Sequence, residues 1–305
     1  YAQSWSAAIQ TNLSQSWILD MSYLGTKGTR LDVQVNPNQA PPGSPLTSLD
    51  RTVIGNATSF AYDTPVGNSI YHAGQVRLNR RFRRNMGGNL QYTFAKSIDN
   101  SSTLGGAGNS IAQNFFNLSA ERGLSSFDRR HALSGTFTLN SPIGGPNGIW
   151  QNKGLLTQIF IGWTVTGNVT YQTGTPLTAR VLGNQSDAAG TGNFGSGRAS
   201  ATGLPIDAGS GFFNLAAFTV PTPGQYGNAG RNTIPGPNSF NINAGMQRII
   251  ALTEKINLQF RIDANNITNH PNISNFGTIV NSINYGVPTS VGGMRNLMLT
   301  VRATF

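Results

Sequence analysis

The feature that most constrains the fold is a strict alternation of apolar and polar side chains along extended segments. In the segment 295–305, RNLMLTVRATF, the apolar residues Leu297, Leu299 and Val301 fall on one side and polar residues such as Thr300 fall on the other. Side chains along a strand point to opposite faces with period two, so the segment predicts a two-faced strand. In a soluble sandwich the apolar face would meet a second sheet, and in an outer-membrane barrel it would meet lipid.

The same alternation recurs along the chain, and strand length separates the two possibilities. The predicted strands are 4–12, 16–25, 70–82, 88–97, 131–140, 159–173, 239–249, 255–266 and 295–305. Most are about ten residues long, whereas strands of soluble proteins usually have about five or six. A tilted strand needs about 9–11 residues to cross a bilayer. The sequence therefore predicts an all-β chain whose strands cross a membrane.

The links between these segments alternate between short and long. Links 13–15, 83–88 and 250–255 are short, 141–158 is intermediate, and 26–69, 98–130, 174–239 and 268–294 are long. Outer-membrane barrels have short periplasmic turns and long extracellular loops, so we predict an antiparallel up-and-down transmembrane β-barrel. Nine strands is an odd number, whereas bacterial single-chain barrels have an even one. We therefore expect residues 1–305 to be the C-terminal part of a larger barrel, with Phe305 at the periplasmic rim.

Composition agrees with this class and leaves one alternative. Only 10% of the residues are charged, against about 25% in globular proteins, as expected where much of the surface meets lipid. The net charge is +10, and one dense basic cluster consists of Arg77, Arg80, Arg81, Arg83 and Arg84. That cluster fits a nucleic-acid patch, or a strand end and turn beside acidic lipid headgroups. Without cysteine, a disulfide scaffold or a thiolate metal site is excluded.

Few residues suggest catalysis or metal binding. The tetrad Asp-Arg-Arg-His at 128–131 places a carboxylate near a histidine, which can orient a base. No serine or cysteine nucleophile motif accompanies it, so we interpret it as an ion-paired strand entrance at the outer rim. The other histidines, His72 and His270, stand alone, without the spacing of a zinc site. We expect no enzyme activity, no catalytic residue, no metal site and no cofactor.

Aromatic side chains are better candidates for a role, because aromatic rings gather at both membrane interfaces of outer-membrane barrels. The predicted interface residues are Trp5, Trp17, Tyr23, Trp163, Tyr171 and Phe305. A second aromatic group, Phe212, Phe213, Phe218 and Tyr226, lies in the longest link. From the sequence, this second group either contacts a ligand or packs the link on itself, and the substrate-binding residues stay unknown.

Several longer motifs resemble one family. They include ERGLSSFDRRHALSGTFTLNSP (121–142), GWTVTGNVTYQTGTPLT (162–178), GQYGNAGRNTIPGPNSFNIN (224–243) and LQFRIDANNITNHPNISNFG (258–277). In their order and spacing they resemble the C-terminal barrel region of TonB-dependent outer-membrane receptors, in particular the Oar-like group with an N-terminal carboxypeptidase-regulatory-like domain. The resemblance implies a 22-stranded barrel closed by a plug and energised through TonB. It also implies that the terminal Phe305 is a signal for the barrel-assembly machinery.

Together these features predict part of a TonB-dependent transporter in the bacterial outer membrane, forming barrel wall and extracellular substrate-capture loops. The plug and the N-terminal domains are absent from these residues. Expected partners are outer-membrane lipid, lipopolysaccharide and the barrel-assembly machinery, with TonB reached only through the missing N-terminal region and no nucleic acid expected. One alternative is a surface structural, adhesive or self-assembling protein, because open strand edges are templates for pairing. The other is a soluble basic β-protein that binds nucleic acid.

Overall fold

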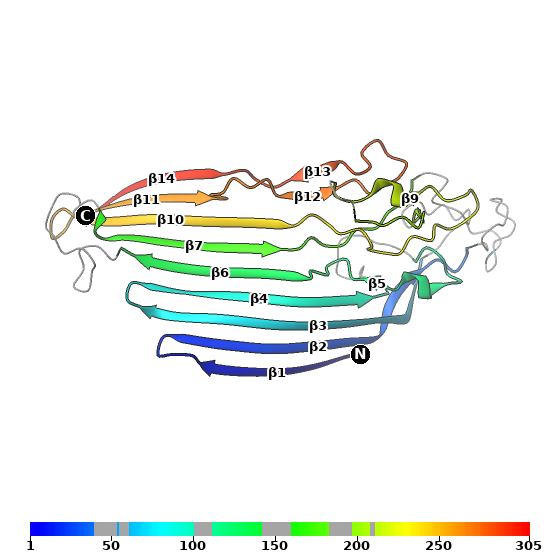
Figure 1. Ribbon diagram of the computed structural model, residues 1–305, viewed down its shortest axis with the longest axis horizontal. Helices are drawn as coiled ribbons and strands as arrows, with labels where there is room; N and C mark the ends of the chain where they lie inside the picture. Colours follow the sequence, from blue (N-terminus) through cyan, green and yellow to red (C-terminus); the bar gives the residue numbers. More distant parts are fainter. Residues whose placement is uncertain (40–53, 55–60, 101–111, 142–159, 183–196, 208–210) are drawn as a thin grey trace.

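The computed structural model describes residues 1–39, 54, 61–100, 112–141, 160–182, 197–207 and 211–305. Their main feature is one antiparallel sheet in which nine long strands follow each other in chain order (Figure 1). These strands are β1 (Ala2–Asn12), β2 (Trp17–Val35), β3 (Tyr62–Arg83), β4 (Met86–Asp99), β6 (His131–Asn140), β7 (Trp163–Gln172), β10 (Ser239–Ala251), β11 (Asn257–Asn265) and β14 (Asn296–Thr304). Each segment predicted from alternation overlaps one of them. The connectivity is therefore up-and-down.

Two strands are longer than the alternation predicted. The structure gives β2 19 residues and β3 22, and they pair from Trp17 opposite Arg80 to Val35 opposite Tyr62. The register shifts between Thr29 and Val33, and Arg30 has a φ of 55° there. A bulge of this kind bends a hairpin and interrupts the two-residue period, so the alternation stops at the bulge although the pairing continues.

Short elements fill the described parts of the long links. They are η2 (Leu118–Glu121), β5 (Gly123–Leu124), β8 (Ser200–Ala201), η4 (Leu215–Ala217), β9 (Phe218–Thr219), β12 (Ile273–Phe276) and β13 (Pro288–Val291). The sequence predicted only loops here, because elements of two to four residues are too short to show a period. Across the described residues, none of the helical segments is long and apolar enough to cross a membrane.

The two ends of the sheet differ. The links that join β1 to β2, β3 to β4, β6 to β7 and β10 to β11 lie at one end, which we call the turn end, together with Phe305 (Figure 1). The described parts of the four long links lie at the other end, the loop end. Residues 142–159, within the β6–β7 link, lie outside the described residues. The segregation of short and long links predicted from the sequence is therefore confirmed.

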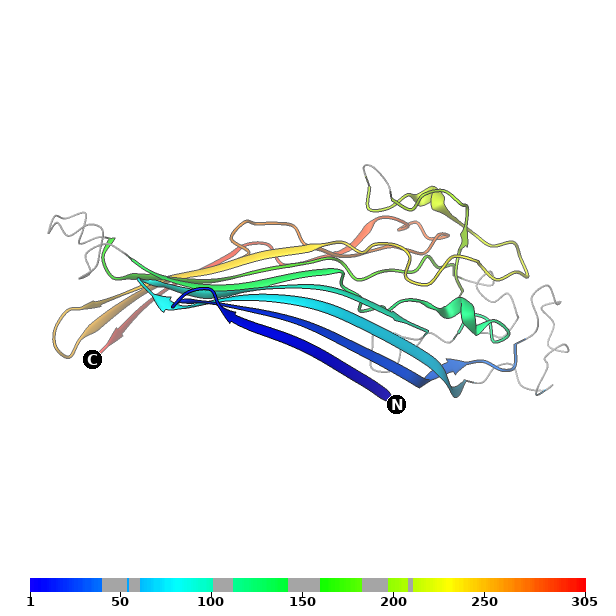
Figure 2. The same ribbon diagram turned by 60° about the horizontal axis from the view of Figure 1, so that its bottom comes forward.

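The sheet is curved but not closed. Within the described residues, β1 pairs with β2 alone and β14 pairs with β11 alone, so both edge strands keep one unpaired side. Figure 2 shows the sheet as a curved layer, with the described segments of the long links gathered beyond its strand ends. The predicted barrel is thus present as an open antiparallel wall.

Dry packing is found at the loop end. The main buried cluster is made by residues of two links, the one between β7 and β10 and the one between β11 and β14. It consists of Ala179, Val181, Ala199, Phe213, Ala217, Phe218, Ala229, Ile234 and Phe276. A smaller cluster joins Val33 and Val35 of β2 to Ala112. We call the described residues of the four long links the loop body. The main hydrophobic cluster holds two of these links together as a packed unit, and the smaller cluster packs a third against β2.

The turn between β3 and β4 allows a test of local geometry. Its two central residues, Arg84 and Asn85, have φ of 49° and 65°, the left-handed pair that a two-residue hairpin turn of type I′ requires. A β-branched residue is strained in that region, so Arg84→Val is expected to lower the free energy of unfolding by about 1–2 kcal/mol. Urea titration of the refolded protein in detergent measures it. The control, Arg84→Gly, removes the same charge without strain, and an equal loss in both variants would contradict the backbone explanation.

Candidate functional site

One face of the sheet is apolar across its whole width. Strand register aligns apolar residues in rows: Phe260 lies opposite Val301, and Ile262 lies opposite both Leu299 and Met246. Val301 is 64% exposed and Leu299 76% exposed. Among the described residues no second layer covers this face, so the sandwich that would bury these side chains is not formed. Such a surface is stable only where lipid or another apolar body contacts it.

The opposite face is polar and hydrogen-bonded from strand to strand. Arg77 donates to Gln91 Oε1 through Nε at 2.9 Å and through its terminal nitrogen at 2.6 Å. Asn89 donates to Thr136 Oγ1 at 2.8 Å on the next strand pair. Near the middle of the sheet a shallow hollow of about 370 Å³ is lined mainly by polar residues of β6, β7, β10 and β11. This face is suited to water rather than to lipid.

The predicted interface aromatics lie at two levels of the strands. Trp17 begins β2, Trp163 begins β7, and Phe305 follows β14, so all three are at the turn end. Phe305 is 97% exposed. Trp5, Tyr23 and Tyr171 lie farther toward the loop end. Trp5 and Tyr171 are near the loop ends of β1 and β7, and Tyr23 lies opposite Ala7 at the middle of β1. The guanidinium carbon of Arg80 lies 5.0 Å from the centre of the Trp17 ring, as a cation–π contact.

All three histidines contact aromatic rings, a feature that the sequence did not predict. Tyr23 Oη lies 2.7 Å from His72 Nδ1, and Tyr92 Oη lies 2.7 Å from His131 Nδ1. The ring of His270 packs edge-on against Phe240. Each Tyr–His hydrogen bond joins neighbouring strands. These pairs depend on strand register, which cannot be read from the separate segments.

The tetrad at 128–131 contains the ion pair that the sequence suggested. The buried carboxylate of Asp128 accepts a hydrogen bond from the backbone N–H of Ser97 at 2.5 Å and lies 3.9 Å from the Arg130 guanidinium. Arg130 in turn lies 5.8 Å from the centre of the Phe94 ring. The Nδ1 atom of His131 lies 2.7 Å from Tyr92 Oη, so this nitrogen is directed to the tyrosine rather than to Asp128. In the described residues, no group of three His, Asp or Glu could hold a metal ion.

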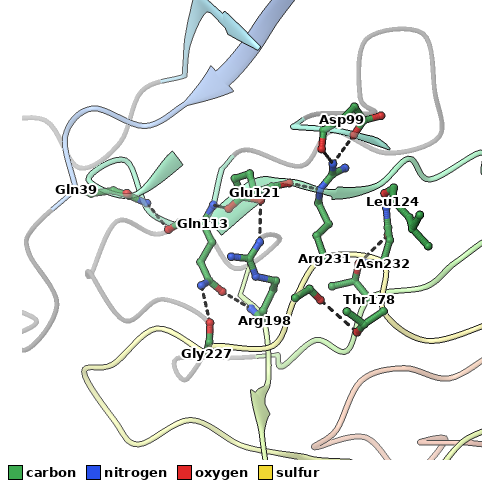
Figure 3. Close-up of polar contacts among 12 residues, drawn as sticks. Gln39, Asp99, Gln113, Glu121, Leu124, Thr178, Arg198, Gly227, Arg231 and Asn232 are labelled. Atoms are coloured by element: carbon green, nitrogen blue, oxygen red, sulfur yellow. Dashed lines mark hydrogen bonds and ion pairs between the residues drawn. The ribbon is translucent and has the colours of Figure 1, made fainter. Parts of the chain in front are cut away.

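A buried ionic network connects the loop body to the sheet (Figure 3). Arg198 donates to Glu121 Oε2 at 2.7 Å, and both side chains are less than 10% exposed. Arg231 forms an ion pair with Asp99, the last residue of β4, and also donates to the backbone carbonyl oxygens of Asp99 at 2.7 Å and Glu121 at 2.8 Å. Buried charges are rare unless paired, so these two pairs fix where the longest link crosses the sheet end.

Amides extend this network. The side chain of Gln113 accepts from the backbone N–H of Arg198 at 2.6 Å and donates to the Gly227 carbonyl at 2.9 Å. Asn232 Nδ2 donates to the Leu124 carbonyl at 2.6 Å, and the Asn232 side chain is bonded to Thr178 Oγ1. The ion pairs join residues 77 and 132 positions apart, which is why no local sequence signal could have revealed them.

The loop aromatics mainly pack the loop body on itself. Phe213 and Phe218 are buried and only 3% and 5% exposed, and Phe213 stacks on Phe276 with ring centres 5.4 Å apart. Tyr285 packs edge-on against Phe213, and its hydroxyl donates to the Leu215 carbonyl at 3.1 Å. Burial raises the pKa of Tyr285 to about 12. The alternative that the sequence left undecided is thus resolved toward packing for Phe213 and Phe218.

The arginine cluster does not form one basic patch. Arg77 bonds to Gln91 within the polar face, Arg80 stacks on Trp17, and Arg83 donates to Gln15 Oε1 at 2.7 Å. Arg84 lies in the turn itself. Alternating strand residues point to opposite faces, so the cluster is divided between the two faces and the turn.

Comparison with known families agrees with this two-faced sheet. A family model described as an outer membrane beta barrel domain matches residues 1–298. The chain belongs to the outer membrane beta-barrel domain family. This family is one of membrane barrels and not of enzymes, and it places the protein in the bacterial outer membrane. The alternative of a soluble protein is therefore wrong.

A solved structure shows the same fold. The outer membrane transporter YddB from Escherichia coli is similar with a TM-score of 0.53 and 10% sequence identity, over 99% of this chain and 32% of that one. At this identity the likeness concerns the fold alone. This outer-membrane barrel domain therefore spans about a third of the length of that transporter. No curated protein sequence matches the chain.

Proposed function

We propose that this domain forms nine neighbouring strands in the wall of a larger, closed TonB-dependent receptor of the Oar-like group. The observation that carries the proposal is the open sheet: its apolar and polar faces are both complete, yet β1 and β14 each keep an unpaired edge. Unpaired strand edges are not tolerated in lipid, so further strands must cover them. The similarity to a transporter of about three times this length and the resemblance of the motifs support the same arrangement.

The orientation follows from the general rule for such barrels. Short turns face the periplasm and long loops face outward, so the loop body would be extracellular and would capture the substrate. Trp17, Trp163 and Phe305 would lie at the periplasmic interface, and Trp5, Tyr23 and Tyr171 would lie toward the outer interface, in contact with membrane lipid and lipopolysaccharide. The exposed Phe305 would be read by the barrel-assembly machinery. The TonB complex would act through a plug region outside these 305 residues.

The unpaired edges also favour a second candidate, a surface protein that assembles with copies of itself through β1 and β14. A cysteine cross-linking experiment separates the two, because the chain contains no native cysteine. Cysteines are placed at Ala7 of β1 and, one at a time, at Leu297, Leu299 and Val301 of β14. A wall within a larger barrel is expected to give no disulfide between β1 and β14 under oxidation in outer membranes. Self-assembly would give one, within a chain or between chains.

Transport itself is tested by energy dependence. Cells that make the protein are expected to remove at least one solute from the growth medium. Cells without its gene are expected to leave that solute in the medium. Removal of TonB should abolish this depletion, while the amount of protein in the outer membrane stays the same. Removal of the solute that continues without TonB would contradict the receptor proposal. If the solute composition of the medium is the same for all strains, the result would favour the structural candidate.

A further inference from the structure

A hollow at the loop end lies where three links meet. It has a volume of about 840 Å³. Its lining residues come from the segment before β6, from the link after β7 and from the end of β12 with the residues that follow it: Ser126, Phe127, Arg129, Thr175, Pro176, Leu177, Thr178, Arg180, Asn232, Asn275, Phe276, Thr278 and Ile279. Small-molecule sites usually occupy about 300–1,000 Å³. The hollow is thus large enough for a ligand of ordinary metabolite size, and none of its lining residues belongs to the membrane-spanning strands.

Two arginines give the hollow its charge. Arg129 and Arg180 both line it and are both exposed, and no acidic residue is among the described residues that line it. The backbone of Arg180 is fixed on both sides, since its N–H donates to the Thr278 carbonyl at 2.9 Å and its carbonyl accepts from Val280 at 2.8 Å. The side chain of Arg129 is held at its tip, where one guanidinium nitrogen donates to the Thr173 carbonyl at 3.3 Å. Two arginines from different links therefore line one hollow.

The rest of the lining is apolar or neutral. Phe127 presents its ring to the hollow and is 60% exposed, whereas Phe276 is buried and forms a fixed part of the wall. Phe276 is held between the rings of Phe212 and Phe213, whose centres lie 5.2 and 5.4 Å away. Asn232 lines the hollow as well and is tied to Thr178, as described above. These contacts set the walls in place before any ligand arrives.

We propose that this hollow binds an anionic solute that has an aromatic or other flat apolar body. Its carboxylate groups would accept hydrogen bonds from Arg129 and Arg180, because a guanidinium matches a carboxylate with two parallel N–H donors. Its apolar body would cover the exposed ring of Phe127. The inference rests on the proposed receptor function and names the class of ligand that the loop body takes.

The test uses carboxyfluorescein, an aromatic polyanion, as a fluorescent probe. Washed outer-membrane vesicles from cells that make the protein are titrated with the probe, and binding is followed by anisotropy. Vesicles that contain the protein are expected to bind the probe saturably, and vesicles without the protein are not. The affinity for the probe should fall as salt screens the charges. Benzene-1,3,5-tricarboxylate should displace the probe, and the uncharged benzyl alcohol should not.

Variants assign the binding to the hollow. Arg129→Gln together with Arg180→Gln is expected to weaken probe binding at least tenfold, and Phe127→Ala severalfold. The control, Arg295→Gln, removes an equally exposed arginine that lies outside the hollow and should bind like the wild type. Absence of saturable binding, or wild-type affinity in the double variant, would overturn the proposal. Equilibrium binding in washed vesicles needs no TonB, so this result is independent of whether the protein transports.

Discussion

Replacing Arg231 with alanine is expected to detach the longest link from the sheet and to make the loop body sensitive to protease. The side chain of Arg231 is buried, forms an ion pair with Asp99, and donates to the backbone of both Asp99 and Glu121. Its removal leaves the Asp99 carboxylate buried without its cation. Breaking a buried pair in this way costs about 3–5 kcal/mol. The loss is local, because the strand ladders of the sheet do not depend on this contact.

The measurement is limited proteolysis of intact cells, which reaches only the outer side of the membrane. Cleavage of the Arg231→Ala protein should be faster by two orders of magnitude or more, since about 3 kcal/mol corresponds to more than a hundredfold in an opening equilibrium. Arg122→Ala is the matched control: Arg122 is an exposed arginine of the same region, hydrogen-bonded to Asn68. Equal cleavage rates in the two variants would show that the buried network does not hold the loop body closed.

A lysine on the apolar face is expected to destabilise the barrel far more than a lysine one position away on the same strand. Val169 of β7 lies opposite Gly135 and Ile242 in the centre of the apolar face. A lysine at mid-membrane on the lipid-facing side costs about 2–4 kcal/mol. Thr170 points to the polar face, between Ser134 and Asn241, where a charged side chain meets water. Val169→Lys and Thr170→Lys therefore form a matched pair with the same added charge.

Two measurements check this pair. The amount of protein assembled in the outer membrane should fall in Val169→Lys and stay close to that of the wild type in Thr170→Lys. Urea unfolding of the refolded proteins should give the difference in free energy directly. If both lysines are tolerated equally, the two faces of β7 have the same environment, and the assignment of lipid to the apolar face is wrong.

Much of the sheet was predictable because it is periodic. Alternation located β7, β10, β11 and β14 to within a few residues, and link length separated the turn end from the loop end. Prediction failed where the period is interrupted or too short. The bulge near Arg30 concealed the outer half of the β2–β3 hairpin, and β8 and β12 have only two and four residues.

The candidate functional residues also differ in whether the sequence alone reveals them. The aromatic residue Phe305 can be identified from the sequence, because the identification depends only on its position at the end of one predicted strand. The pairing of Arg231 with Asp99 joins residues that are 132 positions apart, and the hollow draws Arg129 and Arg180 from different links. Arg129 stands in the tetrad at 128–131, but nothing in the sequence brings Arg180 next to it, because the two arginines meet only when the links pack together.

The sequence alone determined that this chain forms long strands with one apolar and one polar face, joined by alternating short and long links. Strand alternation is a local property, set by the two-residue period of the extended backbone. The tertiary structure alone decided which residues meet across strands and links, including the Tyr–His pairs, the buried ion pairs and the basic hollow. Those contacts depend on register and on the course of the long links, which are fixed only when distant segments pack together.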